Sequence, residues 1–206
     1  MRTVQATAVK PDTSEAILDA MDSLMARYGY RKTTMDDLAR EAGISKRTIY
    51  LYFSSKEEVA LSSIGRVVQT AQARMKQISL EDGDPRQLLE NMLVERVMAR
   101  VRSVEGYRQS LDELFEAVRP AYLARRQTSF EAEQKILAEA LEEGRIAGIF
   151  HFDVASEIAH DLLSATNAYL PYSLSVRELG QIKEIENRVR RLARLLVKGL
   201  EGKESR

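Results

Sequence analysis

Apolar residues recur three and four positions apart along almost the whole chain. No stretch alternates apolar and polar residues over the roughly four to eight positions that a half-buried strand needs. Such spacing is typical of helices that bury one face. Proline, which interrupts helices, occupies only 4 of the 206 positions. The pattern therefore predicts an all-α protein with about nine helices and no sheet.

Capping residues give the expected helix boundaries. Thr13 or Ser14 opens the first helix and Gly29 ends it, because glycine readily adopts the left-handed backbone of a helix end. Thr34 opens the second helix and Ser45 the third, since both residue types cap free N–H groups. Further helices are expected at 55–80, 85–104, around 111–115, and at 120–144, 153–169 and 176–200.

Charge is distributed unevenly. The 31 Lys and Arg balance the 31 Asp and Glu, and a net charge of zero would by itself argue against a nucleic-acid partner. Between Arg27 and Lys56, however, seven basic residues outnumber three acidic ones, a local charge of +4 that the remaining residues offset with −4. This favours a basic module attached to a larger neutral or acidic one, although a solvated helix face gives the same pattern.

The residue inventory excludes several classes of site. The chain has no cysteine, which removes disulfides, thiolate nucleophiles and cysteine zinc sites. His151 and His160 are the only histidines and do not share a helix face, so we expect neither a metal nor another cofactor. A catalyst using His151 and Asp153 lacks the supporting residues, and we expect no enzyme. The polar N-terminus and the lack of a long apolar run predict a cytoplasmic protein without membrane contact.

Residues 34–53 fit a helix-turn-helix. Gly43 allows the tight turn, and Ala39 lets the two helices approach closely. The small core that they share is expected to consist of Leu38, Ile44 and Ile49. Because any helix–glycine–helix unit packs in this way, the turn alone leaves a DNA-binding role open.

Polar and aromatic residues on the outer face of the third helix favour that role. Lys46, Arg47 and Thr48 lie in its first turn, the part of a recognition helix that enters the major groove. Lys56 lies at the start of the fourth helix, where free N–H groups suit a phosphate. The expected DNA contacts are Thr33, Thr34, Ser45, Lys46, Arg47, Thr48, Tyr50, Tyr52 and Lys56.

Short motifs in the segment 16–59 carry a family resemblance. They are Gly29-Tyr30, Thr33-Thr34, Ile44-Ser45, Ile49-Tyr50, Tyr52-Phe53 and Ser55-Lys56-Glu57-Glu58. With them the segment closely resembles the N-terminal domain of the tetracycline-repressor (TetR) family of bacterial transcription regulators. Arg47 departs from the pattern, because many members have a small residue there.

The resemblance implies an all-helical homodimer in which a three-helix DNA-binding domain precedes a larger helical domain. On this basis we expect a flexible N-terminal arm at 1–12, a helix-turn-helix DNA-binding domain at 13–60, and a helical ligand-binding and dimerisation domain at 61–206.

Apolar residues in the last expected helix step by three and four, as in the seam of a packed helix pair. An ordinary core stripe fits the same spacing. The resemblance implies that the final two helices form a four-helix bundle across a dimer axis. The expected interface residues are Ile158, Leu162, Ile182, Ile185, Val189, Leu192 and Leu196.

Large, adaptable side chains between residues 85 and 170 are candidates for the lining of a ligand pocket, although each also suits a core. They are Met92, Met98, Tyr107, Phe115, Tyr122, Phe130 and Tyr169. We therefore expect a repressor that leaves a palindromic double-stranded operator when a small apolar or amphipathic effector binds. The alternative is an activator, or a regulator that responds to a protein partner or to no small ligand.

Overall fold

The computed structural model describes residues 12–174 and 178–202. Within these residues the chain forms eight α-helices, and its only β-type pairing is an isolated bridge between Phe150 and Glu201. The prediction of an all-α protein is confirmed. The expected N-terminal arm, apart from Asp12, lies outside the described residues.

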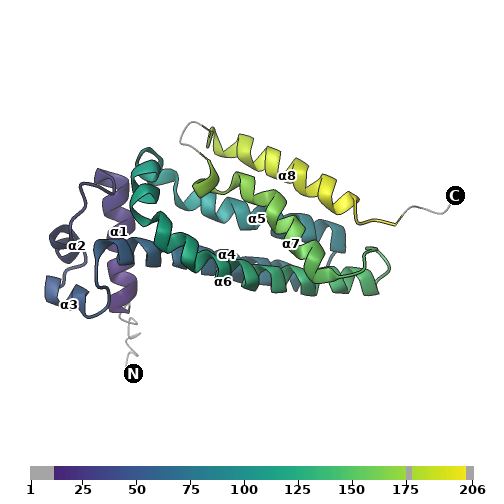
Figure 1. Ribbon diagram of the computed structural model, residues 1–206, viewed down its shortest axis with the longest axis horizontal. Helices are drawn as coiled ribbons and strands as arrows, with labels where there is room; N and C mark the ends of the chain where they lie inside the picture. Colours follow the sequence, from purple (N-terminus) through teal and green to yellow (C-terminus); the bar gives the residue numbers. More distant parts are fainter. Residues whose placement is uncertain (1–11, 175–177, 203–206) are drawn as a thin grey trace, which may run out of the picture.

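Figure 1 shows three short helices at one end of an elongated bundle. These are α1 (Thr13–Tyr28), α2 (Met35–Glu41) and α3 (Lys46–Tyr50). The bundle consists of α4 (Lys56–Ser79), α5 (Pro85–Ser103), α6 (Leu111–Ile146), α7 (Ala155–Thr166) and α8 (Ile182–Lys198). Three short 3-10 turns connect them: η1 (Glu105–Ser110), η2 (Asn167–Tyr169) and η3 (Pro171–Ser173).

The long helices α4 and α6 lie side by side along the molecule (Figure 1). Helix α5 packs against both α4 and α8, and α7 covers α6. Because α4 begins at Lys56, shortly after α3, and continues through the bundle, it runs without interruption across the expected domain boundary at residue 60. Any change in the tilt of α4 therefore reaches the three short helices directly.

Local capping explains where the first elements begin and end. The Asp12 carboxylate accepts a hydrogen bond from Ser14 N, and α1 ends at Gly29, whose φ is 81°. Asp84 caps α5 in the same way with Pro85 at the first helical position, where the missing N–H has no intrahelical partner to lose. The sequence boundaries of these helices are confirmed.

The break expected before Pro120 is wrong. The two helices predicted around 111–115 and at 120–144 are one helix, α6, of 36 residues. Proline frees the carbonyl four residues earlier, here that of Glu116. Both Pro120 and Glu116 are exposed, so that carbonyl remains accessible to water and the helix can continue.

The helices near the C-terminus also differ from their expected limits. Helix α7 is capped by Val154 rather than by the Asp153 side chain, and it ends at Thr166 in a 3-10 turn. The last helix begins at Ile182, while the expected start at residue 176 lies outside the described residues. No helix in the described ranges has the length and apolar character needed to cross a bilayer.

Candidate DNA-binding surface and effector cleft

The packing of α2 against α3 forms a helix-turn-helix. Leu38 and Ile49 are fully buried between the helices, and Ala39 is nearly so. Gly43 makes the turn with φ of 67°, a backbone angle that other residues rarely adopt. The helices are thus held at a fixed angle by a small core.

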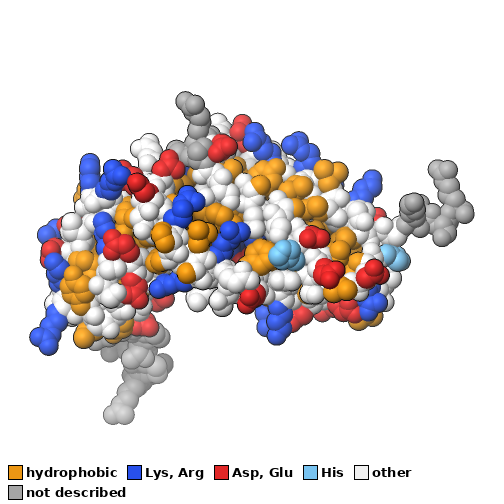
Figure 2. Space-filling view, in the orientation of Figure 1, with side chains coloured by type: hydrophobic (Ala, Val, Ile, Leu, Met, Phe, Trp, Pro, Cys, Tyr) orange, Lys and Arg blue, Asp and Glu red, His pale blue; other side chains and the backbone are white. Residues whose placement is uncertain are grey.

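The start of α3 is ordered by its cap. Ser45 Oγ accepts a hydrogen bond from Thr48 N at 3.0 Å and lies 2.8 Å from Thr48 Oγ1. Lys46 and Arg47 follow on the exposed side. Figure 2 shows Lys and Arg side chains around this end of the molecule. The first turn of α3 therefore presents two cations and two hydroxyl groups on one ordered helix end.

Two tyrosines extend this surface. Tyr50 and Tyr52 are 50% and 47% exposed, although large aromatic side chains are usually buried more deeply. Lys46 forms an ion pair with Asp36, with 2.9 Å between Nζ and Oδ2. That hydrogen bond raises the pKa of Lys46. Exposed pairs of this kind are weak, so the ammonium can exchange the carboxylate for a base or a phosphate.

Lys56 at the start of α4 has a structural role that the sequence did not indicate. Its Nζ donates to the carbonyl oxygen of Tyr30 at 3.1 Å and lies 4.3 Å from the centre of the Tyr30 ring. The Tyr30 hydroxyl in turn donates to Glu57. Burial is the main cause that raises the pKa of Tyr30, and the Glu57 carboxylate is the second. Since Lys56 is only partly buried, it holds the loop before α2 while still facing solvent.

Of the expected DNA contacts, Thr33 does not fit. It is 1% exposed, and its hydroxyl donates to the carbonyl oxygen of Gly29 at 2.9 Å, so no surface remains for a phosphate. Thr34 is exposed and caps α2 in a reciprocal arrangement with Asp37. Its hydroxyl donates to Asp37 Oδ2 at 2.6 Å. The Thr34 N–H also donates to Asp37 Oδ2, at 3.1 Å. Thr34 therefore orients α2 through its cap while its side chain stays exposed.

A cleft of about 540 Å³ lies between α4 and α6. This volume is within the range of about 300–1,000 Å³ usual for small-molecule sites. Tyr122 and Phe130 line it, as the sequence suggested. Tyr107 and Phe115 line a smaller pocket that shares Tyr122 with the cleft. We call the larger of the two the α4–α6 cleft.

The other candidates for pocket residues lie elsewhere. Met92 and Met98 are 0% and 1% exposed in the core of the bundle, and neither lines the cleft. Tyr169 is also absent from its walls. Helical spacing identified these side chains as inward-facing, but it cannot separate the core from the border of a cavity.

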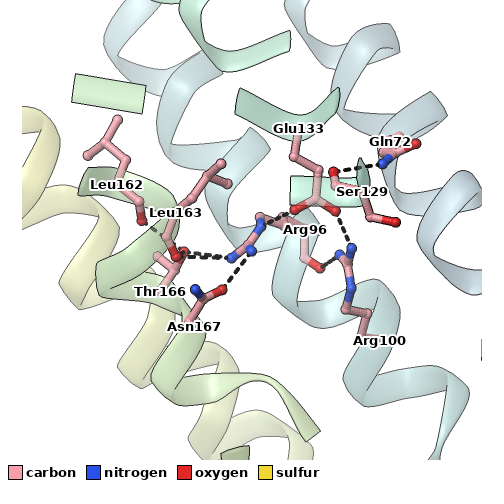
Figure 3. A network of polar contacts seen from close by, with 9 residues as sticks. All are labelled: Gln72, Arg96, Arg100, Ser129, Glu133, Leu162, Leu163, Thr166 and Asn167. Carbon is pink, nitrogen blue, oxygen red and sulfur yellow. Dashed lines mark hydrogen bonds and ion pairs between the residues drawn. The ribbon is translucent and has the colours of Figure 1, made fainter. Parts of the chain in front are cut away.

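The floor of the α4–α6 cleft contains a buried polar cluster that the sequence analysis missed (Figure 3). Arg96 Nε of α5 donates to Glu133 Oε2 of α6 at 2.6 Å, and Arg100 donates to Glu133 Oε1. Arg96 is 2% exposed, Arg100 8% and Glu133 1%. We call them the Arg–Glu–Arg cluster.

Arg96 is held on its other side as well. Its guanidinium donates to Thr166 Oγ1 at 2.9 Å and to Asn167 Oδ1 at 2.8 Å. Arg100 donates to the carbonyl oxygen of Arg96 at 2.6 Å. The cluster thus connects α5, α6 and the end of α7. A spacing of four between two arginines within an apolar stripe was the signal that could have revealed it.

The expected interface residues divide into two groups. Leu162, Ile185 and Val189 are at most 3% exposed within a single chain. They therefore belong to the core of the protomer and have no surface to offer a partner. The remaining residues, partly exposed on α7 and α8, are Ile158, Ile182, Leu192 and Leu196. Leu195, which was not expected there, is 66% exposed on α8.

The two histidines have separate surroundings. The His160 ring packs edge-on against Phe130 at 5.2 Å, while His151 N donates to the carbonyl oxygen of Leu200 at 2.8 Å. Among the described residues no group of three or more His, Asp and Glu side chains could hold a metal ion.

Comparison with known proteins identifies the N-terminal segment. The family model described as "Bacterial regulatory proteins, tetR family" matches residues 17–62. The transcriptional repressor KstR2 of Rhodococcus jostii is 28% identical over 163 residues, 78% of this chain and 78% of that protein. The regulator EthR of Mycobacterium tuberculosis is 37% identical over 73 residues, and this match spans 35% of the chain but only 34% of EthR.

The fold extends the likeness beyond the helix-turn-helix. A solved transcriptional regulator from Cytophaga hutchinsonii superimposes with a TM-score of 0.74 at 22% identity, covering 91% of this chain and 98% of that one. At this identity the likeness concerns the fold alone. The family match and the relatives show that the chain belongs to the TetR family, a non-enzymatic family, and is a helix-turn-helix DNA-binding transcriptional regulator.

Proposed function

We propose that this regulator is a repressor that binds a palindromic operator as a homodimer and leaves it when a small molecule occupies the α4–α6 cleft. Since bacterial DNA lies in the cytoplasm, it would act there. We further propose that residues 13–60 form the DNA-binding unit and residues 61–206 the effector-binding and dimerisation unit. The name of KstR2, a transcriptional repressor, supports repression rather than activation.

The proposed DNA contacts come from the exposed part of the helix-turn-helix. Lys46, Arg47 and Thr48 at the start of α3 would read base edges, because the N-terminal residues of a recognition helix reach them. Tyr50, Tyr52 and Lys56 would contact phosphates, together with Ser45 and the exposed side chain of Thr34. One such helix reads only a few base pairs. Two helices related by a two-fold axis would read a palindrome with half-sites about 34–36 Å apart or a multiple of this.

We propose that the dimer uses the outer surface of α7 and α8. The exposed apolar side chains there, Leu195 above all, form the outward part of the stripe whose inward part packs on α5. Isologous contact of two such surfaces would create a four-helix bundle with two-fold symmetry. The arginines of α8 at 188, 191 and 194 are exposed beside this stripe and would lie at its rim.

The observation that carries the proposed effector response is the composition of the cleft wall. Ser14, Glu15 and Leu18 of α1, together with Phe53, line the cleft alongside α4 and α6. A molecule bound there would therefore contact the DNA-binding unit itself. If the DNA-binding unit has two positions relative to the bundle, an effector that binds one of them more tightly shifts the equilibrium toward that position. The free energy of this shift is the difference between the two binding free energies, commonly about 1–3 kcal/mol.

Selection of duplexes from a random DNA pool by the purified protein tests the DNA half of the proposal. We expect an inverted repeat, bound with an affinity that falls steeply with salt. Lys46→Ala should change the preferred base at one position in each half-site, whereas Tyr50→Phe should weaken all operators alike. Arg102→Ala, an exposed cation on α5, serves as the control. Enrichment of no motif would contradict the proposal.

Repression and release require a second experiment. A reporter driven by the selected operator should be silenced when the protein is expressed, and activation of the reporter would support the alternative instead. A bulky substitution that fills the cleft without charge, Gly65→Leu on α4, should leave operator binding intact and abolish induction by any compound. Gly65 suits this test because it lines the cleft and no heavy atom lies within 4 Å of its added Cβ.

A further inference from the structure

The Arg–Glu–Arg cluster carries an excess of one positive charge, because two guanidinium groups share the single carboxylate of Glu133. Both Arg96 and Arg100 are at most 8% exposed. Burial is the largest influence on Arg96 and lowers its pKa, although the Glu133 carboxylate acts in the opposite direction. An unpaired charge is costly in such a low-dielectric site. The cluster is therefore suited to receive an anion.

All three members of the cluster line the α4–α6 cleft, and Arg100 is the one that also lines the smaller pocket. Its two hydrogen bonds in the described part of the chain, to Glu133 and to the carbonyl oxygen of Arg96, use two of the five N–H donors of a guanidinium. The remaining donors are available to a molecule in the cleft.

A second polar group points to the same place. The Tyr172 hydroxyl is buried and has no hydrogen-bond partner among the described residues, and Tyr172 lines both cavities. Its ring packs on Tyr122 at 5.3 Å and lies 4.7 Å below the guanidinium of Arg126. Because buried hydroxyls are nearly always hydrogen-bonded, the orphaned group indicates a missing acceptor.

Tyr122 completes the polar end of the site. Burial, together with the neighbouring Tyr172, raises the pKa of Tyr122 to about 12. Its hydroxyl therefore stays protonated near neutral pH and can donate to an anion. The rest of the lining combines polar side chains, such as Gln69 and Arg126, with an apolar wall that includes Leu61, Val68 and Phe130.

We propose that the α4–α6 cleft binds an amphipathic monocarboxylate, whose carboxylate lies against Arg100 and the Tyr172 hydroxyl while its hydrocarbon part lies along the apolar wall. A guanidinium and a hydroxyl match the planar, acceptor-only carboxylate, and one negative charge neutralises the excess of the cluster. This inference rests on the proposed function, since it names the chemical class of the effector.

Calorimetric titration of the full-length protein with decanoate, and separately with 1-decanol, tests the inference without DNA. The two probes share a hydrocarbon chain and differ in charge. We expect decanoate to bind and 1-decanol to bind at least about tenfold more weakly, as one charge-assisted hydrogen bond predicts. Equal affinities for the two probes would overturn the assignment.

Two variants locate the carboxylate. Arg100→Gln should weaken decanoate roughly 10- to 100-fold and leave the affinity for 1-decanol unchanged. Tyr172→Phe, which removes only the orphaned hydroxyl, tests the site independently if Arg100→Gln fails to fold, and should weaken decanoate about tenfold. Arg102→Gln on the exposed face of α5 is the matched control and should bind as the parent does. Full affinity in both test variants contradicts the inference.

Operator release is measured separately, by fluorescence anisotropy of a labelled operator duplex. If decanoate binds through Arg100 but leaves the operator complex intact, the inference stands and the proposed function fails. If 1-decanol or another neutral compound releases the operator while decanoate does not bind, the proposed function stands and the inference fails.

Discussion

Replacement of Glu133 by Gln is expected to destabilise the protein strongly. Glu133 is 1% exposed and supplies one carboxylate oxygen to Arg96 and the other to Arg100. The neutral amide retains the shape of the side chain but leaves two buried guanidinium groups without a counter-charge. Removing one partner of a buried ion pair commonly costs about 3–5 kcal/mol, a large part of a total stability of about 5–15 kcal/mol.

Thermal unfolding monitored by circular dichroism measures this effect. For a chain of this size each kcal/mol lowers Tm by about 2–4 °C, so Glu133→Gln should lower Tm by about 6–20 °C. Glu139→Gln is the control, because Glu139 lies exposed on the same helix and its replacement changes the net charge identically. Equal Tm values for the two variants would refute the description of the cluster as buried and paired.

A third variant separates the loss of pairing from the loss of packing. Replacing the whole cluster with Arg96→Met, Arg100→Leu and Glu133→Leu removes its three charges at once. Buried ion pairs exchanged for apolar side chains of similar volume are often neutral or stabilising. The triple variant should therefore be more stable than Glu133→Gln alone, and it should not bind decanoate.

Three other substitutions test the packing. Gly144→Ala should destabilise the protein by about 1–3 kcal/mol in denaturant titrations, because the added Cβ would clash with the buried Phe150 ring. Leu195→Asp should yield a folded monomer in light scattering. Val189→Asp, inside the protomer core, should instead unfold the chain. A folded dimer in both variants would refute the interface. Thr34→Ala should lose about 1 kcal/mol with the α2 cap, and Thr34→Ser should retain it.

The parts of the fold that depend on local signals were predictable. The caps at Thr34, Ser45 and Asp84 and the positive φ at Gly29 and Gly43 fix helix ends within a few residues of chain. The helix-turn-helix needs little more, because its core is formed by residues close in sequence. For this reason the expected exposed contacts of α3, Lys46 and Arg47, lie where the motif implies.

Features that depend on distant residues were not predictable. Helical spacing cannot tell whether an apolar residue faces its own core or a second copy, which is why Val189 was expected at an interface although it is buried. The Arg–Glu–Arg cluster was not predicted for a similar reason, since Arg96 and Glu133 are 37 positions apart in the sequence. Pro120 lies inside α6, where the carbonyl that it frees is on an exposed residue, and this exposure depends on the finished fold.

The attachment of the DNA-binding unit determines how an effector could move it. Arg66 of α4 donates to Glu15, Asp19 and Asp22 of α1 at 2.7–2.8 Å. These partly buried ion pairs fasten α1 to α4, so the three short helices and the start of α4 should move together.

The polar links from this unit and from the rest of α4 to α6 are weaker. Arg31 and Glu116 form an ion pair at 3.2 Å with both side chains more than two-thirds exposed, and Gln72 Nε2 donates to the carbonyl oxygen of Ser129 at 3.2 Å. Such an exposed pair contributes about 0–1 kcal/mol. A ligand that binds between α4 and α6 and moves them apart has to break only these weak polar contacts and the local apolar packing. Suppose that the ligand makes one charge-assisted hydrogen bond in only one of two orientations of α4. This bond, worth about 1.5–3 kcal/mol, is then sufficient to change operator affinity by roughly 10- to 150-fold.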